Sequence, residues 1–371
     1  MPRPSLLISA GEASGDLHGA HLVSALREFF PDASFFGVGG RRMRARGVEI
    51  YSDLSSIASV GIVEGLPTYF RIARVFFAFA KEACRRKPDL AILIDFPEFN
   101  MRLVPRLARA GVPVVYYITP QVWAWRTHRV NRLRRFVDLA LVVLPFEERF
   151  LRRHGVDARF VGHPLLDILP PRAALPNLKE TLGVGDRPLI ALLPGSRTKE
   201  FERHLMILKK TAPIIRRYVD CAFCVGVAPS ISASSVRDCP FPTTDDTHAL
   251  LASADAAVVA SGTATLEAAI YRVPMVVIYR VATFSFTLLG HLVRSRWISL
   301  ANIIAGREVV PEMVQRRATP QKIARQTLRL LDPAVRAATM MRMDSVCAQL
   351  GGRGAVRRAA SHIAGLLEAR A

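Results

Sequence analysis

The segment Val258-Val-Ala-Ser-Gly-Thr-Ala-Thr-Leu-Glu-Ala-Ala269 decides the fold of this chain. A short β-branched run gives way to small residues around Gly262 and then to an Ala/Leu-rich stretch containing Glu267. This order predicts a strand that enters a helix through a loop with little side-chain bulk. The free N–H groups at such a helix start favour a bound anion, and Glu267 is placed to accept hydrogen bonds from a sugar. The alternative is an ordinary helix start capped by Ser261 or Thr263.

A second loop of this kind follows the predicted buried strand at 189–193. Its residues are Pro194, Gly195, Ser196 and Arg197. Glycine lets the backbone approach a ligand, and the arginine side chain offers a planar fork for phosphate oxygens. Because ligands collect at the carboxyl ends of parallel strands, the two loops together predict a site for a nucleotide diphosphate-sugar.

Strand-then-helix alternation runs through most of the 371 residues, and half of the residues are hydrophobic. This pattern predicts an α/β protein with parallel sheets, too long for one ordinary core. A proline-rich segment at 169–176 is typical of a linker. We therefore expect domains at 1–168 and 169–335, and a helical tail at 336–371 that returns to the first domain in its own chain or a swapped one.

The chain has 51 basic and 31 acidic residues, a net charge of +20, which indicates an anionic partner. Nucleic acid is one candidate, but no RNA-binding aromatic signature, zinc-finger spacing or basic tail accompanies the charge. An anionic membrane surface serves equally well. We expect no signal peptide and no stretch of the ~18 apolar residues that span a bilayer. The odd number of cysteines, five, fits a reducing cytoplasm.

The helix predicted at 66–87 combines aromatic residues around much of its circumference with several basic residues. This combination is typical of an element lying in a membrane interface. The alternative is a core-facing helix with a solvated basic side. The predicted membrane contacts are Tyr69, Phe70, Arg71, Arg74, Phe76 and Phe77.

Seven motifs, in order between about residues 5 and 316, resemble the lipid A disaccharide synthase family. Ala301-Asn-Ile-Ile-Ala-Gly306 also resembles a motif of that family, with Ala301 in place of its proline and Asn302 retained. Val60-Gly61 lacks a methionine common before that glycine. The seven motifs lie at 10–19, 95–100, 120–126, 144–147, 161–164, 193–197 and 261–267.

The resemblance implies a GT-B glycosyltransferase, with two Rossmann-like domains facing a cleft. Such enzymes transfer 2,3-diacylglucosamine from UDP to 2,3-diacylglucosamine 1-phosphate and invert the anomeric carbon. The products are a β(1→6) disaccharide 1-phosphate of lipopolysaccharide biosynthesis and UDP. The family works peripherally on the cytoplasmic face of the inner membrane and uses no cofactor or metal. We expect no nucleic-acid partner and consider a homodimer.

Under this resemblance the carboxylate of Asp95, at the end of an apolar strand, is the first choice of general base. His18 is the rival, because an unperturbed imidazole suits this task. The implied acceptor contacts are Glu12, Ser14, Gly15, Glu98, Asn100 and Gln121. The implied donor contacts are Gly195, Ser196, Arg197, Ser261, Gly262, Thr263, Ala264, Thr265, Glu267 and Asn302.

Three alternatives remain at this point. One is another UDP-sugar GT-B enzyme, such as the peptidoglycan N-acetylglucosaminyltransferase or a UDP-N-acetylglucosamine epimerase. The second is a basic nucleic-acid-binding protein. The third is an inactive membrane-binding module, against which Asp95 and Arg197 argue.

Overall fold

A computed structural model describes residues 3–53, 66–124, 127–280 and 296–370, with the backbone alone for 66–71. The chain forms two compact units. Unit 1 contains the residues up to Asp167 together with those from Leu350 onward, and unit 2 contains Ile168–Gln349. Each unit is an α/β structure built on one parallel sheet, as the alternation of strands and helices predicts.

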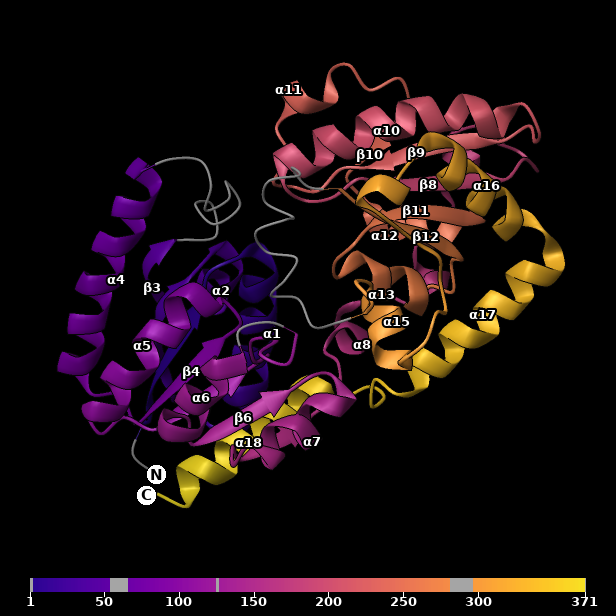
Figure 1. Cartoon of the computed structure of the whole chain (residues 1–371). Helices are drawn as coiled ribbons and strands as arrows, with labels where there is room; N and C mark the ends of the chain where they lie inside the picture. Colours follow the sequence, from indigo (N-terminus) through magenta and orange to yellow (C-terminus); the bar gives the residue numbers. More distant parts are fainter. Residues whose placement is uncertain (1–2, 54–65, 125–126, 281–295, 371) are drawn as a thin grey trace. The chain divides into compact units, whose positions relative to one another are not determined.

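The sheet of unit 1 has the strand order β3-β2-β1-β4-β5-β6-β7, and Figure 1 labels β3, β4 and β6 of it. Most of its strands are apolar throughout, because helices cover both faces of a parallel sheet. The bounds are β1 Ser5–Ala10, β2 Ser34–Gly39, β3 Val48–Asp53, β4 Leu90–Ile94, β5 Val114–Tyr117, β6 Leu139–Val142 and β7 Ala158–Phe160.

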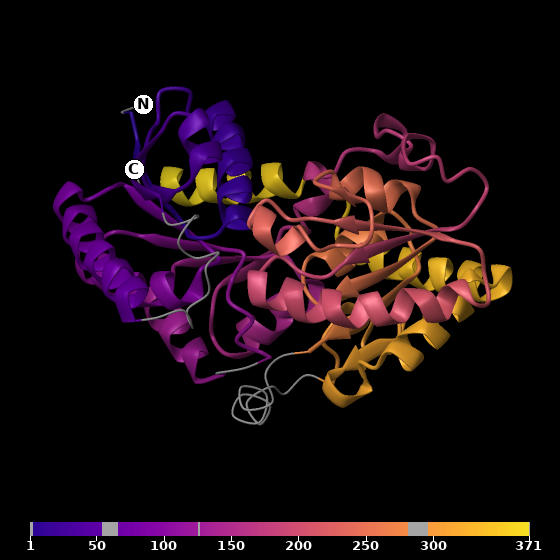
Figure 2. The ribbon, with the colours of Figure 1, turned by 90° about the horizontal axis from the view of Figure 1, so that it is seen from above.

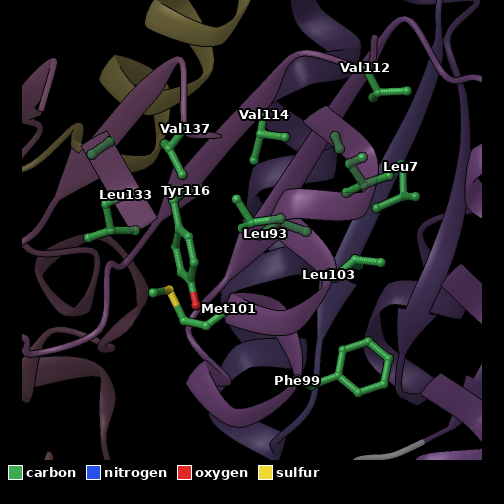
Figure 3. Packing of buried hydrophobic residues seen from close by; sticks show 14 of the residues in the cluster. Leu7, Leu93, Phe99, Met101, Leu103, Val112, Val114, Tyr116, Leu133 and Val137 are labelled. Atoms are coloured by element: carbon green, nitrogen blue, oxygen red, sulfur yellow. The ribbon is translucent and has the colours of Figure 1, made fainter. Parts of the chain in front are cut away.

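One face of this sheet packs against α4, α5 and α6 through a continuous apolar cluster that includes Leu7, Leu93, Leu103 and Tyr116 (Figure 3). On the chain's return to unit 1, α18 packs along α1, as both views show (Figures 1 and 2). The helices of unit 1 are α1 Ala13–Phe29, α2 Arg41–Ala45, α4 Leu66–Arg86, α5 Pro97–Arg109, α6 Val130–Phe136, α7 Pro145–Arg153 and α18 Ala355–Glu368, and the short α8 Leu165–Ile168 ends at the junction with unit 2.

The glycine-rich turn after β2 binds a carboxylate of the protein itself. The Asp16 side chain accepts hydrogen bonds from the N–H groups of Gly40, Arg42 and Met43 at 2.8, 3.0 and 3.1 Å. A phosphate would need these same N–H groups, and because Asp16 already occupies them the turn has a structural role.

The sheet of unit 2 has the order β10-β9-β8-β11-β12-β13, again all parallel. Its strands are β8 Leu189–Leu193, β9 Ala222–Gly226, β10 Thr243–Thr244, β11 Ala256–Ala260, β12 Met275–Tyr279 and β13 Glu312–Val314. Its helices are α9 Leu178–Thr181, α10 Thr198–Arg216, α11 Ala233–Val236, α12 Thr247–Ser253, α13 Ala264–Ile270, α15 Leu300–Ala305, α16 Pro320–Leu331 and α17 Pro333–Ala348.

The returning tail begins later than the sequence predicts. The helix α17 packs on α13, α15 and α16, so residues 336–349 belong to unit 2. Asp167 then holds the start of the true tail, because its carboxylate accepts hydrogen bonds from the N–H groups of Gly354 and Val356 at 2.5 and 2.9 Å. In the described part of the chain, no helix has the length and apolar character needed to cross a bilayer.

Candidate active site

Both sheets reverse their strand order once, and the predicted site loops lie at these reversals. In unit 1 the reversal lies between β1 and β4, where Ala10 pairs with Ile94. In unit 2 it lies between β8 and β11, where Leu193 pairs with Val259. In open parallel sheets the crevice at such a switch point is where ligands bind. The expectation that the two glycine loops of unit 2 follow strands of one parallel sheet is confirmed, and the two strands are neighbours.

Asp95 follows β4 directly and lies beside the loop after β1. Its neighbour Phe96 covers Gly11, where an added Cβ would lie 2.2 Å from the phenyl ring. Burial raises the pKa of the Asp95 carboxyl to about 6, helped by the negative charge of Glu12 and opposed by the Phe96 N–H. A partly buried carboxyl that titrates near neutral pH suits proton transfer.

The main chain at this turn is strained. Asp95 and Phe96 have φ angles of 44° and 49°, both in the left-handed region, and neither is glycine. Such residues cost on the order of 1–3 kcal/mol each and persist where the surroundings hold them. They concentrate at functional sites, so the strain supports a functional role for this turn.

His18 lies in a different environment from Asp95. Burial lowers the pKa of its imidazole to about 4, and the nearby His21 lowers it further. Its Nδ1 is buried without a hydrogen-bond partner among the described residues. A neighbouring buried imidazole, that of His163, has its pKa lowered to about 3 by burial and by the charge of His18. His18 is therefore neutral at physiological pH and a weak base.

The other predicted acceptor contacts in unit 1 lie on several different elements. Ser14 is exposed in the first turn of α1, and the adjacent Gly15 is buried. Glu98 forms an ion pair with Arg129, whose Nη2 lies 3.0 Å from Oε1. Gln121 is exposed in the loop after β5. Ser14 and Gln121 are thus accessible to a ligand.

Asn100 has a structural position that differs from its predicted acceptor contact. It is fully buried, and its Nδ2 donates to the carbonyl oxygens of Asp95, Ile94 and Ser9 at 2.9, 3.2 and 3.3 Å. Its Oδ1 accepts the Ser9 hydroxyl at 2.7 Å. With its amide fully engaged, Asn100 ties the ends of β1 and β4 together and has no group left for a substrate.

The two loops of unit 2 expose backbone and a cationic side chain. Gly195 and Gly262 have φ angles of 122° and 153°, in the region that favours glycine. Ser196 and Arg197 are exposed immediately before α10. Among the described residues, none accepts a hydrogen bond from the N–H groups of Gly262, Thr263 or Ala264. This combination provides the donors for an anionic group.

Two hydroxyls in the same segment serve the protein's own backbone. Ser261 Oγ donates to the carbonyl of Ile298 at 2.7 Å, and Thr265 Oγ1 donates to that of Gly262 at 2.7 Å. They shape the loop, whereas the Thr263 side chain is exposed. Glu267 is partly buried, and burial raises the pKa of its carboxyl to about 7.

Asn302 also has a structural position instead of the predicted ligand contact. It is fully buried, its Oδ1 accepts from the N–H groups of Val309 and Val310, and its Nδ2 donates to Val310 and Glu312. These four bonds lie between 2.7 and 3.0 Å. Ser299 Oγ, which caps α15, donates to Glu312 as well. Asn302 is therefore the centre of a saturated buried network.

His204 is a positioning residue that no sequence motif indicated. Its Nδ1 lies 2.8 Å from the Pro194 carbonyl, and its Nε2 accepts the N–H of Arg280 at 2.9 Å. These partners require a neutral ring with the proton on Nδ1. His204 thereby links the loop after β8 to the end of β12, a contact visible only in three dimensions.

A second residue whose setting the sequence did not indicate is the buried Glu147 at the start of α7. Its Oε1 accepts the Trp123 indole N–H at 2.9 Å, and its Oε2 accepts the Leu144 N–H at 3.1 Å. Burial raises the pKa of this carboxyl to about 7. The indole N–H of Trp123 is thus bound by a carboxyl of the protein itself.

The helix α4 has one buried face and one exposed face. The predicted membrane contact Phe76 is wrong, because this residue is buried in the core with its ring 5.1 Å from that of Phe99. Arg74 and Phe77 are exposed, and Phe77 retains 61% of its accessible surface. The side chains of Tyr69, Phe70 and Arg71 lie outside the described residues.

Comparison with known proteins identifies relatives along the whole chain. A family model described as lipid-A-disaccharide synthetase matches residues 6–364. The chain is 41% identical over 374 residues to the lipid-A-disaccharide synthase of Myxococcus xanthus, covering 98% of each chain. It is 40% identical over 373 residues to that of Anaeromyxobacter dehalogenans strain 2CP-C, covering 98% and 97%.

Solved structures with low sequence identity share the fold. The Staphylococcus aureus MnaA–UDP co-structure matches with a TM-score of 0.70 at 14% identity, over 98% of this chain and 97% of that chain. CalG4, the calicheamicin glycosyltransferase, matches with a TM-score of 0.62 at 18% identity over 99% of each. Together with the two parallel sheets, these likenesses establish the predicted GT-B class.

Proposed function

Because the chain belongs to the lipid-A-disaccharide synthase family, we propose that it transfers 2,3-diacylglucosamine from UDP to 2,3-diacylglucosamine 1-phosphate. The products are the β(1→6)-linked disaccharide 1-phosphate and UDP. The observation that carries the proposal is the Asp95 carboxyl, at the switch point of the unit 1 sheet with a pKa raised to about 6. A nucleic-acid-binding role would require no such group.

In this proposal Asp95 is the general base. Inversion by single displacement requires one base to take the proton of the acceptor's 6-hydroxyl as its oxygen attacks the anomeric carbon. The bond between that carbon and the diphosphate breaks, and UDP leaves with the electron pair. Asp95 is favoured over His18, because a carboxylate whose pKa is about 6 is a stronger base than an imidazole whose pKa is about 4.

The loops of unit 2 supply the donor site of the proposal. Arg197 and the N–H groups at 262–264 stabilise the charge that develops on the departing diphosphate. Glu267 accepts hydrogen bonds from the ribose hydroxyls. Asn302 and His204 hold the surrounding loops in place through the buried contacts described above.

A UDP-release assay with both diacyl sugars in detergent micelles tests the function. The wild type is expected to release UDP in proportion to disaccharide formed. Asp95→Asn is expected to lose about 10²–10⁴-fold in kcat, the usual contribution of a general base, and His18→Asn much less. Absence of release from the folded wild type rejects the function, and near-normal turnover by Asp95→Asn rejects this base.

The exposed face of α4 supports a second part of the proposal, attachment to the cytoplasmic face of the inner membrane. Arg74 and Phe77 pair a cation for headgroups with an aromatic ring for the acyl boundary. Phe77→Ser is expected to weaken sedimentation with anionic phosphatidylglycerol vesicles. Tyr218→Ser in unit 2 removes a ring that is 74% exposed and serves as the control. Equal binding by both variants contradicts this membrane face.

A homodimer remains a prediction of the proposal. Since α18 packs on α1 of its own chain, such a dimer does not require exchange of that helix. Sedimentation velocity at several protein concentrations measures it, and a single monomeric species throughout contradicts it.

A further inference from the structure

The strained turn at Asp95 is held by two side chains that bind its carbonyl oxygen. The Asn100 Nδ2 donates to this oxygen at 2.9 Å, and the Tyr116 hydroxyl donates to it at 2.8 Å. Both donors come from elements that flank the turn, α5 and β5. Two donors thus fix the backbone carbonyl of Asp95, and neither of them binds its side-chain carboxyl.

The orientation of Asn100 is determined by its neighbours. The Ser9 hydroxyl donates to Oδ1, so Nδ2 faces the carbonyl oxygens of Asp95, Ile94 and Ser9. Because Ser9 is in β1 and Ile94 in β4, the amide ties the two strands at which the sheet reverses its order. A shift of the Asp95 turn would break several of these bonds at once.

Tyr116 is immobilised by packing. Its ring is fully buried in the apolar cluster beside Leu93, Leu133 and Met101 (Figure 3). A rigid ring places the hydroxyl at one point, where it meets the Asp95 carbonyl. The next residue provides a natural contrast: Tyr117 is equally buried, but its hydroxyl has no partner among the described residues.

We propose that Asn100 and Tyr116 are positioning residues that hold the Asp95 carboxyl in place through its own backbone carbonyl. The inference rests on the proposed role of Asp95 as base. Neither residue touches a substrate in this account. Their contribution is to keep two consecutive left-handed residues in a geometry that the chain would otherwise leave.

The sharpest test compares Tyr116→Phe with Tyr117→Phe. Each variant removes one buried hydroxyl from adjacent residues of β5, but only the first removes a hydrogen bond. Tyr116→Phe is expected to lower kcat about tenfold at unchanged KM for both sugars, whereas Tyr117→Phe stays within twofold of the wild type. Equal kcat in the two variants overturns the proposal.

A double variant separates positioning from general damage to the fold. If Tyr116 acts through the Asp95 carboxyl, adding Tyr116→Phe to Asp95→Asn lowers the residual turnover no further. A purely structural effect would lower it by the same tenfold. Asn100→Ala is expected to lower kcat more than Tyr116→Phe does. If Asn100→Ala folds poorly, the comparison of Tyr116→Phe with Tyr117→Phe still tests the proposal.

A readout without turnover distinguishes failure of this inference from failure of the proposed function. Proteins labelled with 13C at aspartate carboxyls are titrated by NMR, and Asp95→Asn assigns the signal. Tyr116→Phe is expected to move the Asp95 titration toward the ordinary aspartate range, and Tyr117→Phe to leave it in place. If Tyr116→Phe shows this shift but the wild type releases no UDP, the positioning role is kept and the proposed reaction is rejected. If Tyr116→Phe shows no shift, the positioning role is rejected.

Discussion

The two units place their loops at equivalent points of their sheets but build the turns differently. In unit 1 the turn at the switch point has Asp95 and Phe96 in left-handed conformations. In unit 2 the corresponding loops use Gly195 and Gly262 for positive φ. Side chains of Asn100 and Tyr116 hold the left-handed Asp95 of the first turn, whereas glycine adopts the positive φ of the unit 2 loops at low cost.

The difference follows from what each turn presents. A loop that binds an anion through backbone N–H groups gains from glycine, because the absence of a side chain lets the ligand approach. A turn that must present a carboxylate cannot use glycine at that position. It therefore carries strain and requires the hydrogen bonds that Asn100 and Tyr116 donate to the Asp95 carbonyl. The four predictions below address this contrast, from the largest expected effect to the smallest.

Asp95→Gly converts the unit 1 turn into the unit 2 type. We expect kcat to fall by at least about 10²–10⁴-fold, because the base is lost. The free energy of unfolding should not fall, since the release of left-handed strain and of a buried charge offsets the backbone entropy of glycine. UDP release and thermal unfolding measure the two effects. A marked drop in Tm contradicts the account of strain.

Asn302→Ala removes the centre of the buried network in unit 2. The N–H groups of Val309 and Val310 and the carbonyl oxygen of Val310 would each lose the partner that Asn302 provides. Each such buried group costs about 1–3 kcal/mol, so we expect a loss of at least about 3 kcal/mol in unfolding free energy. Asn177→Ala removes exposed hydrogen bonds to Lys179 and Glu180 at the start of α9 and should cost about 1 kcal/mol. Denaturant unfolding of both gives the comparison, and equal losses contradict it.

The affinity for UDP should depend on pH through Glu267. Its pKa is raised to about 7, so the carboxylate that accepts ribose hydrogen bonds is lost as the pH falls below that value. We expect UDP to bind more tightly at pH 8 than at pH 6. The stability contribution has the opposite sign: it is present at low pH and lost as the pH rises through about 7. Calorimetric titration of the wild type and Glu267→Gln isolates this group from the titration of UDP itself, and identical pH dependence rejects the role.

Gly262→Ala tests the conformational argument alone. No atom of the described residues lies within 4 Å of a Cβ added there, so among them only the positive φ opposes the substitution, and we expect a cost of about 1 kcal/mol. At Gly195 an added Cβ would lie 2.6 Å from Glu200 Oε2, so Gly195→Ala should cost more. Thermal unfolding of the two variants ranks them. The reverse order would contradict this account.

The alternation of apolar runs and helices was sufficient to predict two parallel-sheet units and the main loops, because backbone hydrogen bonding and burial act locally on such patterns. The sequence by itself also placed Asp95, Arg197 and the 261–267 loop at strand ends. The membership of α17 in unit 2 was missed, since helix periodicity does not show which surface a helix packs against.

Only the tertiary structure decided the roles of the asparagines. From the sequence, Asn100 and Asn302 could not be distinguished from polar residues in exposed loops, and both were predicted to contact substrates. Folding buries them among backbone groups distant in the sequence, where an amide can satisfy donors and acceptors at once. A motif indicates that a polar residue is needed. Burial and hydrogen-bond partners determine whether that residue contacts the ligand itself or positions another residue that contacts it.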